Sequence, residues 1–295
     1  MAYSGLRLSF STNAFVRTSI FEAVESIAAL GFEGVELLAD MPHLFPEATG
    51  PAKIEKLRLQ LTRLGLKPAN INANTAIGYY GREFWEPLFE PSIANPDPTA
   101  RRWRIDYSKR CIDMAQSLNC PNVSLTSGRL APAIAPDQSM VLLREALEEL
   151  VEYAGERNIR LGLEYEPGLL IENHLELAWL LAEIDSPFLG VNLDLGHSHV
   201  LGEDPEAILQ LFGERIFHIH LEDIRGRKHY HLIPGQGQVD FSALFNLLAR
   251  HGYRGFVTVE LYTYAHAPEE AARNSILYLN RILSGQGREG ERAYH

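Results

Sequence analysis

Residues 190–222, GVNLDLGHSHVLGEDPEAILQLFGERIFHIHLE, contain the pattern that decides the fold. Two short apolar runs, 190–195 and 216–222, flank residues 205–212, where apolar side chains recur at helical spacing. The stretch therefore predicts a strand, a helix and a second strand. Strict alternation of this kind is typical of a parallel sheet that is covered by helices.

The same alternation extends in both directions over almost the whole chain. Six further strands are predicted at 6–11, 34–39, 67–74, 123–126, 160–166 and 256–261. Further helices are predicted at 19–30, 52–64, 101–118, 139–157, 175–184, 241–251 and 269–283. Eight strand–helix pairs favour a closed (β/α)8 TIM barrel, which takes about 250 residues, over an open doubly wound sheet. Because no linker-like stretch divides the chain, we expect one domain over residues 1–283, followed by a polar tail at 284–295.

A long segment without helical or strand periodicity, residues 75–100, follows the third predicted strand. Long irregular loops are uncommon unless they cover or bind a ligand, and this one follows a strand at the end where barrel enzymes keep their sites. Its aromatic side chains can cover a small substrate or simply attach the loop to the barrel rim. Both interpretations stay open, and Trp85 is the candidate substrate contact.

Composition and charge narrow the classes of function. The chain has 46% hydrophobic and 22% charged residues, with a formal net charge of −11, so its surface repels nucleic-acid backbones and no nucleic-acid partner is expected. No apolar run reaches the ~20 residues of a membrane span, and no signal peptide is visible at the start. Cys111 and Cys120 cannot form a disulfide framework, and we expect a cytoplasmic protein.

Four predicted strands end in side chains that could bind a metal: Glu164, Asp194, His220 and Glu260. Each interrupts an apolar run, where an unpaired charge is costly. One such acid alone is usually paired with an arginine or a helix N-terminus, but three of them with a histidine at one end of a barrel would be unfavourable neighbours unless a cation lay among them. Three carboxylates and one imidazole suit Mn²⁺, Mg²⁺, Zn²⁺ or Co²⁺.

Histidines are concentrated in the same part of the chain. Six of the eleven lie between residues 197 and 231, which is typical of metal binding or proton transfer. His218 and His220 share strand parity, so both side chains can point into a barrel. We expect His220 to be the metal ligand, because it lies nearer the carboxyl end of its strand, and His218 to fill the interior or support the ligands.

At these positions the sequence resembles the xylose-isomerase-like barrel superfamily, in particular its sugar phosphate isomerase/epimerase group. That group includes ketose 3-epimerases, hydroxypyruvate isomerase and inosose dehydratase, and endonuclease IV is a more distant relative. The resemblance covers nearly the whole chain. It is carried by Glu164, Asp194-Leu-Gly-His197, His220-Leu-Glu-Asp223, His231 with Gly235-Gln-Gly237, and Glu260.

The resemblance implies one divalent metal on Glu164, Asp194, His220 and Glu260, with the two glutamates also acting as acid and base. His197 is implied as a substrate contact near the metal. Candidates for holding the substrate are Arg225, Arg227 and Asn72, together with Trp85. Nuclease relatives also build a metal position from residues that match His197 and His231 and from an aspartate where this chain has His229, so a second metal or a substrate contact at these three histidines is a further expectation.

The implied reaction is removal of a proton beside a carbonyl, which gives an enediolate and then an epimer or isomer of a small ketose, sugar phosphate or hydroxy-carbonyl compound. A dehydratase or lyase acting on a sugar or cyclitol is the first alternative. A zinc phosphodiesterase like endonuclease IV is less favoured, because the expected histidines are absent from the third strand, where Asn72 stands, and from the fourth. A binding protein without turnover also stays open, and relatives imply a homodimer or homotetramer.

Overall fold

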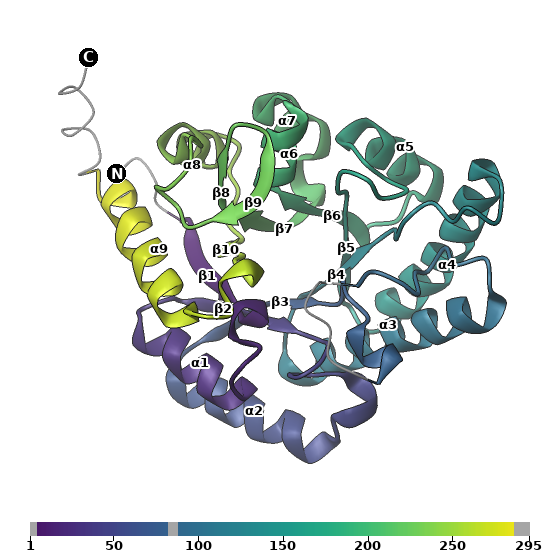
Figure 1. Ribbon diagram of the computed structural model, residues 1–295, viewed down its shortest axis with the longest axis horizontal. Helices are drawn as coiled ribbons and strands as arrows, with labels where there is room; N and C mark the ends of the chain where they lie inside the picture. Colours follow the sequence, from purple (N-terminus) through teal and green to yellow (C-terminus); the bar gives the residue numbers. More distant parts are fainter. Residues whose placement is uncertain (1–4, 82–87, 286–295) are drawn as a thin grey trace.

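Eight parallel strands close into a barrel with the order β1-β10-β7-β6-β5-β4-β3-β2 (Figure 1). The computed structural model describes residues 5–81 and 88–285. The barrel strands are β1 Arg7–Ser11, β2 Gly34–Leu38, β3 Lys67–Asn72, β4 Asn122–Thr126, β5 Arg160–Glu164, β6 Leu189–Asp194, β7 Ile216–Leu221 and β10 Phe256–Val259. This confirms the predicted (β/α)8 TIM barrel.

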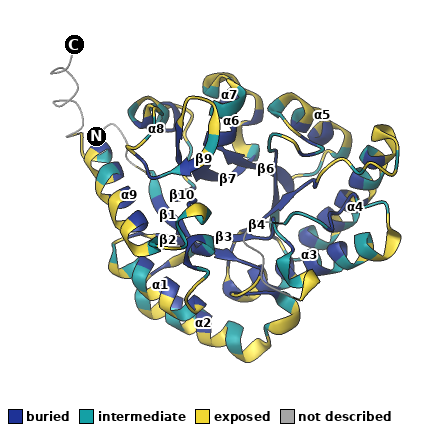
Figure 2. Cartoon of the chain, viewed as in Figure 1, coloured by how far each residue is buried: buried dark blue, intermediate teal, exposed yellow. Residues whose placement is uncertain are grey.

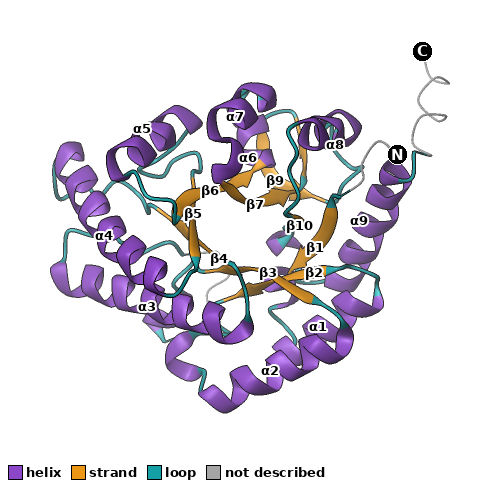
Figure 3. Ribbon diagram, turned by 180° about the vertical axis from the view of Figure 1, so that it is seen from behind, coloured by secondary structure: helices purple, strands orange, loops and turns teal. Residues whose placement is uncertain are grey.

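Helices surround the barrel on the outside (Figure 3). They are α1 Ile20–Ala29, α2 Pro51–Leu64, α3 Pro98–Leu118, α4 Pro136–Glu156, α5 His174–Ile184, α6 Leu195–Leu201, α7 Pro205–Phe212, α8 Phe241–Arg250 and α9 Pro268–Leu283. Helices α3 and α4 each begin three residues earlier than predicted, at a proline in the first turn. Proline fits there because its fixed φ is helical and its missing N–H needs no partner. None of the described helices is long and apolar enough to cross a membrane.

A two-stranded hairpin and a short helix were not predicted. A short antiparallel hairpin, β8 Asp223–Arg225 and β9 Lys228–Leu232, follows β7, and helix α6 follows β6 directly. Neither has a periodic apolar pattern long enough to detect, since β8 has three residues and α6 has seven. In the predicted long loop a 3-10 turn, η3 Ile77–Tyr80, precedes the gap in the described residues. Trp85 lies outside the described residues.

The apolar core lies between the strands and the helices, while part of the barrel interior is polar. Figure 2 shows most of the barrel strands as almost continuously buried. Along β7, Ile219 and Leu221 belong to the apolar core and alternate with His218 and His220, as expected because successive strand side chains point to opposite faces. Other buried polar side chains on barrel strands include Ser9, Glu36, Asn70, Ser124, Asn192 and Thr258. Polar side chains therefore converge inside the barrel.

Arg104 of α3 fixes the loop that follows β3. It is buried, and its guanidinium donates to the carbonyl oxygens of Ala73, Asn74 and Thr75 at 2.6, 2.7 and 3.0 Å. These carbonyls have left the barrel sheet, and buried backbone groups need a partner. The guanidinium therefore holds the backbone that carries Asn74.

Replacing Arg104 by methionine is expected to lower the free energy of unfolding by roughly 3 kcal/mol, because buried carbonyl oxygens lose their donor. Urea unfolding followed by circular dichroism measures the change. Arg102→Met on the same helix removes an exposed ion pair with Glu149, and should cost less than about 1 kcal/mol. Equal losses in the two variants would contradict this role of Arg104.

Candidate functional site

The four predicted metal ligands lie together at the carboxyl ends of their strands. Glu164 ends β5, Asp194 ends β6, His220 is on β7, and Glu260 follows β10. His220 Nδ1 lies 3.5 Å from Glu164 Oε2, 3.9 Å from Asp194 Oδ2 and 3.4 Å from Glu260 Oε2. One ligand atom from each of the four residues lies within 4.8 Å of the others, and none of the four residues is more than 6% exposed.

Asparagine amides hold the two glutamates. Asn74 and Asn192 donate to Glu164 Oε2 at 2.6 and 2.5 Å. Asn13 and Asn72 donate to Glu260 Oε1 at 2.8 and 3.1 Å. Glu260 Oε2 is therefore left to face the imidazole of His220. Asn72, predicted as a substrate contact, thus contacts a glutamate of this group.

The donor set fits a divalent cation. Among the residues that the structure describes, no lysine or arginine forms an ion pair with Glu164, Asp194 or Glu260, whose only charged partners are histidines. Asp194 Oδ2 is buried and has no hydrogen-bond partner there. Oxygen and imidazole ligands around one centre suit Mn²⁺, Mg²⁺, Co²⁺ or Zn²⁺.

Glu36 of β2 orients His220 by contacting the ring nitrogen that faces away from the three carboxylates. Its Oε2 lies 2.6 Å from His220 Nε2 and 3.3 Å from His218 Nε2, and it accepts from the amide of Asn70 at 2.8 Å. Burial opposes ionisation of Glu36, but the charge and hydrogen bonds of His220 and His218 hold its pKa well below the usual range. An ionised Glu36 only accepts, so His220 Nε2 carries a proton and Nδ1 turns toward the three carboxylates. His218 therefore lies beside the ligand support, as predicted.

A second group of histidines lies next to the first. One ring nitrogen from each of His197, His229 and His231 lies within 4.8 Å of the other two. His231 Nδ1 is 3.0 Å from the Glu260 carbonyl oxygen, and because a carbonyl oxygen can only accept, Nδ1 is the donor. The other ring nitrogen of His231, Nε2, lies 2.7 Å from His229 Nε2. His197 Nδ1 likewise lies 3.0 Å from the carbonyl oxygen of Tyr165. The sequence prediction that these three residues lie near one another is therefore consistent with the geometry.

The pKa values of these histidines diverge. Burial lowers the pKa of His229 to about 4 and that of His231 to about 3, so both rings are neutral at pH 7. Burial also disfavours a charged His197, but Asp194 and Glu166 raise its pKa to about 9. One charged and two neutral imidazoles therefore flank the carboxylates.

Glu222 brings a further carboxyl group to Asp194. Both of its oxygens are buried and have no hydrogen-bond partner among the described residues. Burial, followed by the charge of Asp194, raises its pKa well above the ordinary value. A Cβ at Gly196 would lie 1.6 Å from Glu222 Oε1, so any other residue there would displace the Glu222 carboxyl group. Asp194, Glu222 and His231 form another potential ligand set.

The two arginines proposed to bind substrate lie on the hairpin. Arg225 and Arg227 are both exposed, and Arg225 donates to the carbonyl oxygen of Gln236 at 2.6 Å. Arg227 lies against Gly202 at the end of α6. In the described part of the chain, neither forms an ion pair with the acids of the carboxylate group, which is our name for the cluster of Glu164, Asp194, His220 and Glu260. Their role in substrate binding therefore stays a prediction.

Sequence reasoning missed Glu36, gave Glu222 no role of its own, and did not predict that asparagine amides hold the two glutamates. Glu36 was detectable, because it is the one charged residue in the run Gly34–Leu38, every residue of which is buried. It was not predicted because it lies in the middle of its strand, whereas the candidate ligands were sought at strand ends. The asparagines gave no comparable signal, since their role depends on which glutamate lies opposite after the barrel closes.

The chain is similar in sequence to two groups of enzymes, epimerases and dehydratases. The chain is 27% identical to fructoselysine 3-epimerase of Shigella flexneri over 273 residues, covering 90% of this chain and 94% of that protein. It is 28% identical to 3-dehydroshikimate dehydratase of Pseudomonas putida over 271 residues, covering 89% of this chain and 39% of that larger protein.

Solved structures share the fold. A D-tagatose 3-epimerase-like protein aligns with a TM-score of 0.75 at 22% identity, covering 94% of this chain and 99% of its own. A zinc-bound IolI protein aligns with a TM-score of 0.77 at 19% identity, covering 95% and 98%. A family model described as a xylose isomerase-like TIM barrel matches residues 24–282. The chain belongs to the xylose isomerase-like TIM barrel family.

Proposed function

We propose that this chain is a divalent-metal-dependent isomerase or epimerase of a small ketose, sugar phosphate or hydroxy-carbonyl compound. The observation that carries the proposal is the buried group of Glu164, Asp194, His220 and Glu260, without a lysine or arginine partner among the described residues. It lies at the barrel end where enzymes of this architecture keep their reacting groups. Similarity to fructoselysine 3-epimerase supports epimerisation.

Glu164 and Glu260 are the proposed proton carriers. A divalent cation held by the four ligands would acidify the C–H next to a carbonyl that it binds. One glutamate removes that proton as a base, and the other returns a proton to the opposite face of the same carbon, which inverts it. Without a metal, burial raises the pKa of Glu260 to about 8. The charges of Glu164 and Glu36 act in the same direction, and the charge of His220 opposes them.

A dehydratase is the second candidate, supported by similarity to 3-dehydroshikimate dehydratase and, over 40% of this chain, to inosose dehydratase of Clostridium tetani. In that reaction the proton is removed in the same way, but a neighbouring hydroxyl leaves as water. The two candidates differ in their products. Mass spectrometry detects the loss of 18 Da on dehydration, whereas epimerisation leaves the mass unchanged.

Turnover in D₂O is expected to place one deuterium on the carbon whose proton is exchanged, because a carboxyl group that removes a proton exchanges it with solvent. NMR of the products from fructoselysine, D-tagatose, D-psicose and D-fructose measures the incorporation. Turnover without deuterium would contradict proton removal by a carboxylate. Binding of these sugars with no turnover of any of them would favour a binding protein.

Metal analysis of the purified chain is expected to give one ion per chain, and two if His197, His229 and His231 hold a second. Asp194→Asn should abolish binding at the first position, because it replaces a buried carboxylate that has an unpartnered oxygen. Inductively coupled plasma mass spectrometry after dialysis against Mn²⁺ or Zn²⁺ measures both quantities. An unchanged ion content in Asp194→Asn would contradict the assignment, and three ions per chain would favour the phosphodiesterase alternative.

A further inference from the structure

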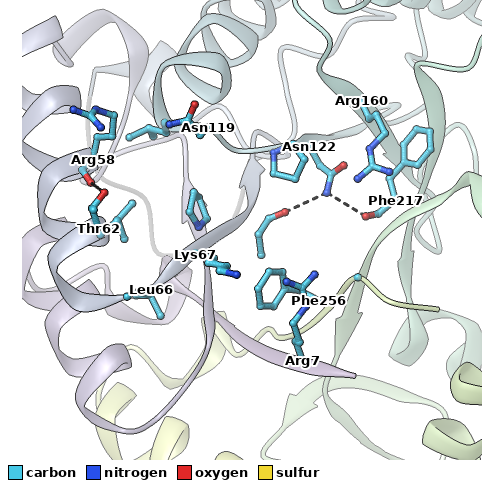
Figure 4. Close-up of a pocket in the computed structure, with 17 residues that line it drawn as sticks. Arg7, Arg58, Thr62, Leu66, Lys67, Asn119, Asn122, Arg160, Phe217 and Phe256 are labelled. Atoms are coloured by element: carbon cyan, nitrogen blue, oxygen red, sulfur yellow. Dashed lines mark hydrogen bonds between the residues drawn. The ribbon is translucent and has the colours of Figure 1, made fainter. Parts of the chain in front are cut away.

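A cavity of about 500 Å³ opens at the end of the barrel opposite the carboxylate group (Figure 4). It lies where strands β1, β3, β4, β5 and β10 begin and where helices α2 and α3 end. Its volume is within the range of small-molecule sites, roughly 300–1,000 Å³. The residues that matter for its chemistry are Arg7, Arg58, Lys67, Asn122, Arg160 and the rings of Phe217 and Phe256.

The cavity lining is strongly basic in an acidic protein. Arg7, Arg58, Lys67 and Arg160 line it, and none of the aspartates or glutamates that the structure describes does, although the chain has 38 acidic residues and a net charge of −11. Arg58 is paired with Glu55 at 2.7 Å. The other three cations form no ion pair with any carboxylate in residues 5–81 or 88–285. Uncompensated positive charge therefore faces this cavity.

Two of these cations are held in place by aromatic rings. The guanidinium of Arg7 lies 4.1 Å from the ring centre of Phe256, and that of Arg160 lies 4.8 Å from the ring centre of Phe217. Such stacking fixes a guanidinium plane and leaves its N–H edges free to donate. Within residues 5–81 and 88–285, Arg7 donates one hydrogen bond, to the carbonyl oxygen of Arg254 at 3.1 Å, and no acceptor is found for Arg160. Most of the N–H donors of the two arginines are therefore available to an anion.

The cations are not needed to cap the helices that end nearby. At the end of α2, the carbonyl oxygens of Leu61 and Thr62 already accept from the backbone N–H of Gly65. At the end of α3, Ala115 and Gln116 accept from Asn119 in the same way. Backbone N–H groups, and not the cations of the cavity, therefore hold these four carbonyl oxygens.

Asn122 adds an independent sign of a ligand. Its side chain is 3% exposed and lines the cavity. Its Nδ2 donates to the carbonyl oxygens of Ala69 and Phe217 at 3.2 and 3.1 Å, as Figure 4 shows. Its Oδ1 has no hydrogen-bond partner among the described residues. A buried acceptor without a donor calls for an O–H or N–H group from elsewhere.

We propose that this cavity binds a small phosphate ester of a sugar or polyol. The phosphate would be held by Arg7, Lys67 and Arg160, and a hydroxyl of the ligand would donate to Asn122 Oδ1. Arginine is well suited to phosphate because its fork of N–H donors matches two phosphate oxygens. The site is separate from the carboxylate group and does not depend on the proposed reaction there.

Calorimetric titration of the full chain with ribose 5-phosphate tests the proposal. We expect saturable binding of one ligand per chain, weaker binding of inorganic phosphate and no binding of ribose. The double variant Arg160→Gln with Lys67→Gln should weaken binding at least tenfold, since two of the three phosphate contacts lose their charge. Arg63→Gln is the matched control, because it removes one exposed cation of α2 that pairs with Glu25, and it should leave the affinity unchanged.

Two further variants keep the test decisive. Lys67→Gln alone alters an exposed side chain and should still weaken binding several-fold if the double variant fails to fold. Asp194→Asn alters the carboxylate group and should leave the affinity unchanged. Equal binding in wild type and in the Lys67 and Arg160 variants would overturn the proposal. Binding that Asp194→Asn abolishes, or that never saturates, would overturn it as well.

Discussion

Glu164→Gln and Glu260→Gln should each lower turnover by roughly 10²- to 10⁴-fold, the usual contribution of a positioned acid or base. Each substitution keeps the size of the side chain and removes its ability to exchange a proton. Steady-state rates on whichever ketose turns over measure the loss. Both residues are also proposed metal ligands, so the rates must be measured at saturating metal, with the bound ion counted in the same samples.

The control for these two variants is Glu33→Gln, which changes an exposed glutamate just before β2 and should leave the rate unaltered. Deuterium exchange separates the two roles further. If one glutamate is the base for a given epimer, its glutamine variant should lose deuterium exchange when that epimer is the substrate. Full activity in either glutamine variant with metal bound would contradict the proposed acid–base pair.

Glu36→Gln should weaken metal binding roughly 10- to 100-fold, although Glu36 is not one of the four proposed ligands. Glu36 Oε1 accepts from Asn72 at 3.0 Å, and Oε2 accepts from Asn70 at 2.8 Å and lies 2.6 Å from His220 Nε2. All of these neighbours donate. A glutamine amide therefore points its own donor at another donor in either orientation, and His220 loses the negative charge that holds its proton on Nε2.

Competition of Zn²⁺ with a chromogenic chelator measures the affinity of this variant. NMR of ¹⁵N-labelled histidine reports which nitrogen of His220 carries the proton, a readout that a general loss of stability would not move. Glu33→Gln again serves as the control. Unchanged zinc affinity together with an unchanged His220 tautomer in Glu36→Gln would contradict this role.

The sequence allowed the barrel and the four central residues to be predicted for one reason. Each of these features is local: an apolar run, a helical period, or an acid at the end of a strand. Glu164, Asp194, His220 and Glu260 could be grouped because parallel strands present their carboxyl ends at one edge. The hairpin β8–β9 escaped prediction because Lys228–Leu232 has no clean alternation of apolar and polar residues.

The remaining features depend on contacts made only when the chain closes. Glu36 meets His220 across 184 positions of sequence, and Asn72 meets Glu260 across 188. Nothing in the local sequence around Asn72 distinguishes a clamp on a glutamate from a contact with substrate. The basic cavity likewise collects side chains from the starts of separate strands, so no single stretch of sequence displays it.

The amide clamps on Glu164 and Glu260 have a consequence for repeated turnover. Asparagine does not titrate, so Asn13 and Asn72 can donate to one oxygen of Glu260 both before and after a proton arrives at the other, although they bind the ionised carboxylate more strongly. The carboxyl group can gain and release its proton without swinging to a new rotamer. The enzyme would then begin each cycle with its geometry already set, and little reorganisation would be needed between successive substrates.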